Sequence, residues 1–372
     1  MKHGGIETFL MSMLRTCDRQ RFDMDILCTR SAKGPYTERA RQLGADVTEC
    51  PMSYDQVRFV YKLYKLLRRR RYDCLNSHLS DLGGGALLAA LLAGIPYRVA
   101  SYHQMRPDMG FIKNLYLWIM RRLVLRTATS ITTSSPAVSR SYFGTTTAKG
   151  RIQAISYGVD TQFFAEKPKE PVKLSQLGFS PNNVIVGHLG TYRRQKNHQA
   201  LVKIAALTVK QVPEARFLLC GRPVATSREP GATLYERIGR QIEQLGLSKF
   251  VVRVPGFDDV RQFYQAIDVF VLPSREEGMP VSIIEAQAAG KPVVASRIEG
   301  IVIATAPEMR DNLFDVDDVE SFARCLVQLL KNKDRMKAQG LAGQAYVREN
   351  LDIKAAVRKY QELYLPQDKL ND

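Results

Sequence analysis

Residues 270–296 read Phe-Val-Leu-Pro-Ser-Arg-Glu-Glu-Gly-Met-Pro-Val-Ser-Ile-Ile-Glu-Ala-Gln-Ala-Ala-Gly-Lys-Pro-Val-Val-Ala-Ser. The apolar run at the start is typical of a parallel strand that is buried on both faces. After a loop containing Gly278, a helix is predicted from near Pro280, whose fixed φ suits a first helical turn, and it ends at Gly290. A second apolar strand follows at once. This order places a helix N-terminus at the carboxyl edge of a parallel sheet, where backbone N–H groups commonly bind phosphate.

The same alternation of strand and helix runs through the whole chain, which predicts an α/β fold with parallel sheets covered on both faces. The second half has predicted strands at 184–189, 216–220, 251–254, 269–272 and 292–295. The first half has predicted strands at 24–29, near Val47, and at 74–78, 98–103, 130–133 and 152–155. Its predicted helices span 7–17, 36–43, 55–70, 84–93 and 112–127, and a tail helix spans 353–364.

A length of 372 residues is too great for one ordinary core and favours two domains. The polar, proline-broken run at 166–171 is the predicted linker. We therefore expect one domain at 1–165 and a second at 172–350. A helical tail at 351–372 is expected to pack back toward the first domain.

The bulk composition is that of a globular protein with a strong positive charge. Hydrophobic residues make up 45% of the chain and the formal net charge is +17, which favours anionic partners. No C-x-x-C pair and no metal-ligand spacing of histidines is present, and thiols in apolar runs are typical of a reducing cytoplasm. No apolar run is long enough to cross a bilayer. We expect a cytoplasmic protein without a bound metal.

Two glutamates in the deciding stretch have the chemistry to hold sugar hydroxyls. Glu277 stands just before the predicted helix N-terminus and Glu285 lies inside the helix. A carboxylate beside a phosphate site is poorly suited to bind phosphate but can accept hydrogen bonds from hydroxyl groups. The alternative is that Glu277 stabilises the helix dipole and Glu285 lies on the surface.

The spacing of these residues resembles the signature of retaining glycosyltransferases of the GT-B fold, in family four (glycosyl transferases group 1), of the type found in bacterial polysaccharide biosynthesis. The signature has a glutamate, seven residues and a second glutamate, with Gly278 and Pro280 at the turn. The resemblance implies two Rossmann-like, doubly wound domains facing a cleft. It also implies that Glu277 contacts the donor sugar, Glu285 contacts the ribose, and the backbone of Gly278 and Met279 approaches sugar and phosphate.

A second match lies at 186–198, which resembles the family's strand and loop ending in Lys-Asn-His. The resemblance makes Lys196 the residue that neutralises the donor diphosphate. Thr191 stands where the family has an arginine. Arg193 or Arg194 can replace that arginine, although their register differs, and the alternative for each is a solvated loop charge.

In the first half, Gly4 and Gly5 resemble the family's glycine-rich first loop, which approaches the donor phosphate and the acceptor. His103, at the end of a predicted strand, matches a histidine that faces the donor sugar, and His78 is a weaker candidate. A structural role for either histidine stays open. Because the family has an apolar strand before this loop, we expect the native chain to start upstream of Met1 or to be truncated.

Two basic stretches raise the question of membrane contact. Arg68 to Arg71 are four consecutive arginines, and the stretch 111–126 combines basic residues with Trp118, the only tryptophan. Basic and aromatic residues on a helix suit an anionic membrane surface. A core helix with a solvated basic edge is an equal alternative.

Taken together, these features predict a retaining, metal-independent glycosyltransferase of the hexosyltransferase type that needs no cofactor. Its donor is expected to be a UDP- or GDP-sugar. Its acceptor is a saccharide or a lipid-linked saccharide, in cell-surface polysaccharide synthesis. The resemblance implies front-face displacement without a protein nucleophile. The alternatives are an epimerase of the same fold, a non-enzymatic scaffold and a basic nucleic-acid-binding protein, although no DNA- or RNA-binding module is recognisable.

Overall fold

The computed structural model describes residues 5–29, 31–52, 55–107, 109–144, 150–223 and 233–365. The chain divides into two compact units, which are described separately. Unit 1 comprises Met1–Gly158 and Ile353–Asp372, and unit 2 comprises Val159–Asp352. The division falls before the polar run at 166–171. Val159 joins unit 2 because its backbone N–H donates to the Leu351 carbonyl over 3.0 Å.

Unit 2 is built on a parallel sheet with the strand order β12-β11-β10-β7-β8-β9. Along the chain these strands are β7 (Val184–Leu189), β8 (Ala215–Cys220), β9 (Val251–Val254), β10 (Val269–Leu272), β11 (Val293–Ser296) and β12 (Leu313–Phe314). From β7 the chain runs outward through β8 and β9, then returns to the other side of β7 with β10. The order therefore reverses between β7 and β10, and ligands of such folds bind at the carboxyl ends of the strands at this point.

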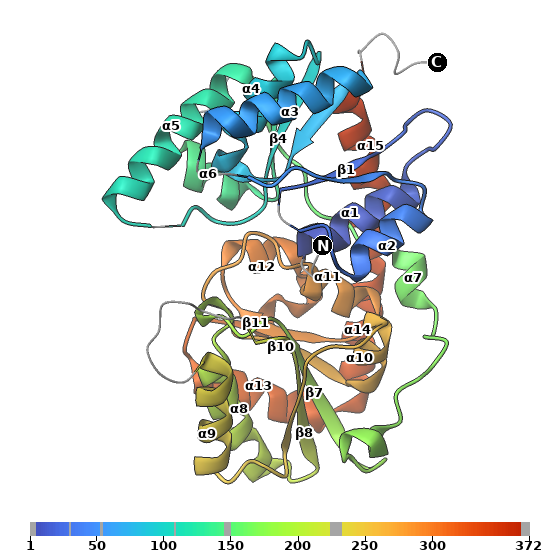
Figure 1. Ribbon diagram of the computed structural model, residues 1–372. Coiled ribbons are helices and arrows are strands. Elements are labelled where there is room, and N and C mark those ends of the chain that lie inside the picture. The colour runs from blue at the N-terminus through green and yellow to red at the C-terminus, as the bar shows by residue number, and fades with distance from the viewer. Residues whose placement is uncertain are drawn as a thin grey trace. The chain divides into compact units, whose positions relative to one another are not determined.

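Helices cover both faces of this sheet (Figure 1). The helices of unit 2 are α7 (Thr161–Ala165), α8 (His198–Gln211), α9 (Leu234–Gln244), α10 (Val260–Ala266), α11 (Val281–Ala288), α12 (Glu299–Ala304), α13 (Val319–Leu330) and α14 (Lys333–Asn350). Successive side chains of β10 alternate between the faces. Val269 and Val271 join the core formed with α8, α9 and α13, whereas Phe270 packs against Phe263 and Tyr264 of α10.

The strands of unit 1 form two parallel sheets. One pairs β1 (Ile26–Cys28) with β2 (Val47–Glu49). The other has the order β3-β4-β5-β6, with β3 (Cys74–Ser77), β4 (Tyr97–Tyr102), β5 (Ser130–Thr133) and β6 (Ile152–Ala154). The expectation that the native chain starts upstream of Met1 stays a prediction.

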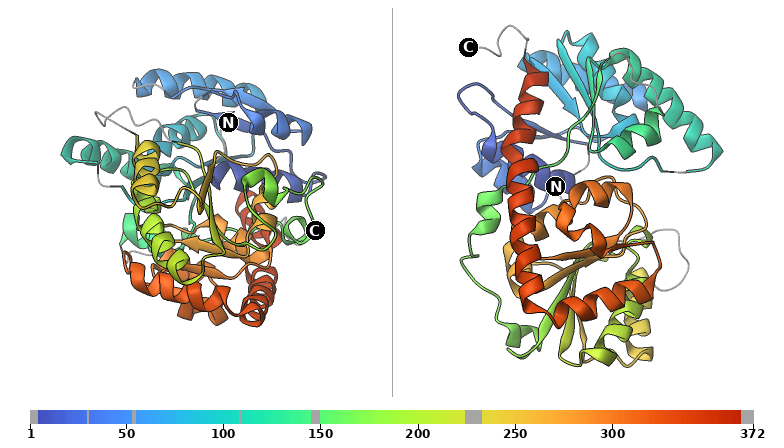
Figure 2. Two further views of the ribbon diagram at one scale, coloured as in Figure 1. Left: turned by 90° about the horizontal axis from the view of Figure 1, so that it is seen from below. Right: turned by 180° about the vertical axis from the view of Figure 1, so that it is seen from behind.

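The helices of unit 1 are α1 (Gly5–Thr16), α2 (Pro35–Gln42), α3 (Gln56–Arg70), α4 (Gly84–Leu92), α5 (Phe111–Thr127) and α6 (Pro136–Phe143). The tail forms α15 (Ile353–Tyr364), which packs on α1 within the same unit (Figure 2). Tyr360 of α15 contacts the ring of Phe9 and, through its hydroxyl, Thr132 of β5. This tail therefore closes the core of unit 1.

The predicted α/β class is confirmed, and most predicted elements lie within a residue or two of those observed. The helix predicted at 55–70 is α3, but not all of its large apolar side chains are buried. Val57 and Tyr61 are exposed, and Phe59, Leu63 and Leu67 form the buried face.

Candidate functional site

The site candidates of unit 2 gather at the strand-order reversal. Lys196 ends a short 3-10 turn (Arg194–Lys196) after β7, and Glu277 lies in the loop after β10. The Lys196 ammonium donates to Glu277 Oε1 over 2.6 Å. The two side chains are only 17% and 8% exposed, so water screens the pair little. The residues predicted to hold diphosphate and sugar are therefore direct neighbours.

The two loops that carry this pair are joined by further hydrogen bonds. The Arg275 backbone N–H donates to the Gln195 carbonyl over 2.8 Å, and the Gln195 side chain donates to the Glu276 carbonyl over 2.6 Å. The guanidinium of Arg275 also forms an ion pair with Asp317 over 2.7 Å. Asp317 in turn accepts a 2.9 Å hydrogen bond from the Asn197 side chain. The sequence analysis did not predict these hydrogen bonds and this ion pair, which together fix the position of Lys196 relative to Glu277.

Glu285 lies on α11 and is 6% exposed, so the alternative of a surface glutamate is wrong for this residue. Its carboxylate accepts a 2.8 Å hydrogen bond from the Tyr264 hydroxyl. Burial raises the pKa of Glu285 to about 7, and the hydrogen bond from Tyr264 opposes that rise. This carboxyl group can therefore change its protonation near neutral pH.

The loop before α11 leaves no room for a side chain against it. A Cβ added to Gly300 would lie 2.4 Å from the Glu277 carbonyl oxygen and 2.5 Å from that of Gly278. The close approach of α12 therefore requires glycine at this position. Met279, in the same loop, is 4% exposed. The sequence contains a signal for this contact: Gly300 lies in the first turn of α12, where glycine is a poor helix former and therefore indicates a close approach of another segment.

The backbone around Thr191 is equally close-packed. A Cβ on Gly221 would lie 1.9 Å from the Gly190 carbonyl oxygen. Arg193 and Arg194, the two predicted substitutes for the family arginine, both have exposed side chains just after this contact. Arg193 precedes the turn that ends at Lys196 and Arg194 begins it, so both stand beside Lys196 at the same sheet edge.

In unit 1, the predicted His103 lies one residue beyond the carboxyl end of β4. It is 5% exposed, and both of its ring nitrogens are hydrogen-bonded. Its Nε2 lies 2.7 Å from Nδ1 of His78, and its Nδ1 is hydrogen-bonded to the Tyr157 hydroxyl. The three rings stack in a row. Burial lowers the pKa of His78 to about 4 and the pKa of His103 well below its ordinary value, so both imidazoles are neutral at pH 7.

Helix α1 begins at Gly5, where a Cβ would meet nothing within 4 Å. Gly4 lies outside the described residues. Within the described part of the chain, no helix is both long and apolar enough to span a bilayer.

Comparison with known proteins agrees with this architecture. Residues 181–332 match the family model described as glycosyl transferases group 1. Residues 4–158 match the model described as a glycosyl transferase 4-like domain. The two matched segments fall in unit 2 and unit 1, respectively.

Two curated relatives cover most of the chain. It is 27% identical over 303 residues to EpsF of Bacillus subtilis, which is named as a glycosyltransferase, covering 80% of this chain and 77% of that one. It is 26% identical over 342 residues to the UDP-Gal:α-D-GlcNAc-diphosphoundecaprenol α-1,3-galactosyltransferase of Escherichia coli, covering 89% and 86%.

A solved structure shares the fold across nearly the whole chain. HepE of Anabaena, in its complex with UDP-glucose, superposes with a TM-score of 0.82 at 20% identity, covering 97% of this chain and 95% of that one. The similarity to HepE shows the GT-B fold, and the two family models, which together match most of the chain, show that it belongs to the glycosyltransferases.

Proposed function

We propose that this chain is a retaining glycosyltransferase of family four that moves a hexose from a UDP- or GDP-sugar to a hydroxyl group of a saccharide or lipid-linked saccharide. The observation that carries the proposal is the 2.6 Å pair of Lys196 and Glu277 at the strand-order reversal of unit 2. In a nucleotide-sugar the sugar is bonded directly to the diphosphate. A cation for the phosphate and an acceptor for a sugar hydroxyl must therefore stand side by side.

The protein's contribution to the reaction is positioning and electrostatic stabilisation. Lys196, with Arg193 or Arg194, would compensate the charge that grows on the departing diphosphate. The backbone of Gly278 and Met279 would approach the same phosphate, and Glu277 would orient the sugar. Because the departing oxygen can take the proton of the attacking hydroxyl on the same face, no side-chain nucleophile is needed and the configuration is retained. These cationic and amide groups also support transfer without a metal.

The named activity of one relative supports the donor and acceptor classes. The Escherichia coli enzyme is named for transfer from UDP-Gal to a diphosphoundecaprenol-linked sugar with an α-1,3 linkage. An α product is what retention yields when the donor sugar is α-linked to its diphosphate. HepE of Anabaena binds UDP and UDP-glucose in its solved complexes. We therefore propose a UDP-sugar as the first donor to test. We also propose that the protein works in the cytoplasm, on a saccharide that becomes part of a cell-surface polysaccharide.

The test uses donor hydrolysis, which needs no knowledge of the acceptor. Purified protein in EDTA is given UDP-, GDP- and ADP-sugars, and free nucleotide diphosphate and the anomer of the released sugar are followed by NMR. We expect one base to be preferred and the α anomer to appear before mutarotation. Glu277→Gln should lose at least about a hundredfold in rate, as is typical when a group acting on the transition state is removed. The neighbouring exposed Glu276 supplies the matched control, Glu276→Gln, which should retain the wild-type rate.

Each part of the proposal can fail separately. Release of the β anomer would exclude retention, and a rate abolished by EDTA but restored by Mg²⁺ would exclude metal independence. Conversion of the nucleotide-sugar to its epimer without free diphosphate would favour the epimerase alternative. Equal losses in Glu276→Gln and Glu277→Gln would remove the assigned role of Glu277.

A further inference from the structure

Helix α5 is anchored to unit 1 through its second half. Arg121, Val124 and Thr127 are its buried residues. The Arg121 guanidinium forms an ion pair with the buried Asp81 over 2.7 Å and donates to the Tyr142 carbonyl over 3.0 Å. Figures 1 and 2 show that the first half of the helix extends away from the sheet of unit 1. The helix is therefore held rigidly at one end and projects at the other.

The projecting half carries large apolar side chains that have no core to enter. Phe111 is 84% exposed and Ile112 is 82% exposed. Leu115, Trp118 and Ile119 are each close to half exposed. At 100° per residue these five positions form one stripe, about 120° wide, on the helix surface. An exposed apolar patch of this kind marks an interaction surface, since water contact with so much apolar area is unfavourable.

Arginines lie on the same face of the helix as the stripe, and α5 contains no acidic residue. Lys113, Arg122 and Arg126 are exposed, and the Arg122 guanidinium lies 4.9 Å from the ring centre of Trp118. Arg122 and Arg126 continue the stripe one and two turns toward the anchored end. With a rise of about 1.5 Å per residue, Arg122 lies roughly 4–5 Å beyond Ile119 along the axis. The apolar tip is thus followed by a layer of positive charge.

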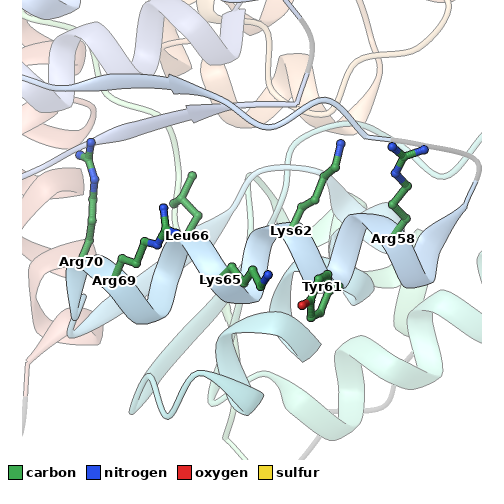
Figure 3. A pocket seen from close by; sticks show the side chains of 7 residues that line it. All are labelled: Arg58, Tyr61, Lys62, Lys65, Leu66, Arg69 and Arg70. Carbon is green, nitrogen blue, oxygen red and sulfur yellow. The ribbon is translucent and has the colours of Figure 1, made fainter.

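A second basic surface lies on α3, which packs against the same helix α4 as α5 does. A hollow of about 540 Å³ lies along α3, and Figure 3 shows the side chains that line it. It is lined by Arg58, Tyr61, Lys62, Lys65, Leu66, Arg69 and Arg70. α3 also contains no acidic residue. Two helices of one layer therefore present cations and exposed aromatic rings without any acidic residue of their own.

We infer that the projecting tip of α5, Phe111 to Ile119, inserts into the interface of an anionic phospholipid bilayer, with Arg122 and Arg126 at the level of the lipid phosphates. An apolar stripe followed by arginines matches the order of layers met on entering a bilayer, in which headgroup phosphates cover the hydrocarbon. Neither α5 nor α3 carries an acidic side chain that would be repelled by anionic headgroups. The surface deepens the proposed function, because it would bring the enzyme to a lipid-linked acceptor.

The single tryptophan of the chain, Trp118, lies on the stripe and reports on its surroundings without labelling. The whole protein is mixed with vesicles of phosphatidylcholine and phosphatidylglycerol, in the absence of donor and acceptor. We expect the Trp118 emission to shift to the blue and to be quenched by lipids brominated on their acyl chains. Vesicles of phosphatidylcholine alone should bind much less, and added salt should weaken binding because it screens the arginines.

Two pairs of substitutions distinguish insertion of the α5 tip from nonspecific adsorption of the protein to vesicles. Phe111→Ser with Ile112→Ser should lower vesicle partitioning by about tenfold for each side chain removed from the membrane. The matched control changes two exposed leucines of unit 2, Leu245→Ser and Leu341→Ser, which are 47% and 58% exposed, and should partition like wild type.

The outcomes are distinguishable from those of the transfer reaction, since binding is read without substrate. Binding to anionic vesicles with no change in Trp118 emission would overturn the assignment to α5. A blue shift that grows with protein concentration and needs no vesicles would assign the stripe to a second copy of the chain. Loss of donor hydrolysis with normal vesicle binding would count against the proposed function alone.

Discussion

Glu285 offers a quantitative test of the unit 2 site. Its pKa is raised to about 7 by burial, from an ordinary value of 4.5. Below pH 4.5 the carboxyl group is protonated in both the folded and the unfolded chain, and its burial then carries no charge penalty. As the pH rises from 4.5 to 7, the unfolded chain ionises while the folded one does not, so stability falls until the folded group also ionises.

The size of this effect follows from the shift. Since a tenfold change in an equilibrium is worth about 1.4 kcal/mol, a pKa raised from 4.5 to about 7 corresponds to about 3 kcal/mol of stability lost by pH 8. The side chain is 6% exposed, so little of this is removed by solvent screening. For a unit of this size, about 3 kcal/mol corresponds to roughly 6–12 °C in the unfolding midpoint.

Glu285→Gln removes the titration and keeps an acceptor for Tyr264. We expect this variant to unfold at nearly the same temperature as wild type at pH 4.5 and to be roughly 6–12 °C more stable at pH 8. Tyr264→Phe removes the hydrogen bond that opposes the pKa rise and should move the titration to still higher pH. The assay is thermal unfolding from pH 4.5 to 8.5, followed by hydrogen exchange of α11 amides so that unit 2 is read separately. Parallel pH profiles for wild type and Glu285→Gln would refute the reasoning.

Three further predictions concern the same residues and their neighbours. Lys196→Ala leaves the carboxylate of Glu277 buried and unpaired, so the free energy of unfolding of unit 2 should fall by about 3 kcal/mol in urea. The double variant Lys196→Met with Glu277→Leu should recover most of that stability but should not recover donor hydrolysis. An equal loss in the single and double variants would contradict a coupled pair. Gly300→Ala places a methyl group 2.4 Å from the Glu277 carbonyl oxygen, and should cost about 1–3 kcal/mol and weaken UDP binding in calorimetry. Unchanged affinity would show that the loop adapts. In unit 1, the pKa of His78 is lowered to about 4, so the free energy of unfolding should be greatest above pH 6.5 and should decline as the pH falls toward 4, because the unfolded chain is protonated first. Tyr157→Phe removes the hydrogen bond to His103 and should alter the ¹⁵N shifts of that ring. If the protection of the β4 amides against hydrogen exchange stays constant as the pH falls from 6.5 to 4, the buried histidines are not held neutral.

Much of the fold could be predicted because buried parallel strands leave a strong sequence signal. The predicted bounds of β7, β9, β10 and α15 are those observed. By contrast, β12 has only two residues, Leu313–Phe314, and no apolar run distinguishes it from a loop. For α5, composition could not decide between a core helix and an exposed one. The choice depends on where α4 begins, because its first residue, Gly84, lies against Met120 and Leu123 of α5. The buried residues of α5 all lie in its second half, and its first half is largely exposed.

The candidate site shows where sequence reasoning ends. The motif could name Lys196 and Glu277 but could not predict that they form a pair. Lys196 and Glu277 are 81 residues apart in the sequence, and they meet because β7 and β10 are neighbours in the sheet. The pairing changes how the site would work. A lysine already neutralised by a carboxylate contributes less net charge to a diphosphate than a free one, but it is held in place before the donor arrives. If our proposal is correct, the additional positive charge must come from the exposed Arg193 or Arg194, and the side chain that supplies it should be ordered by donor binding.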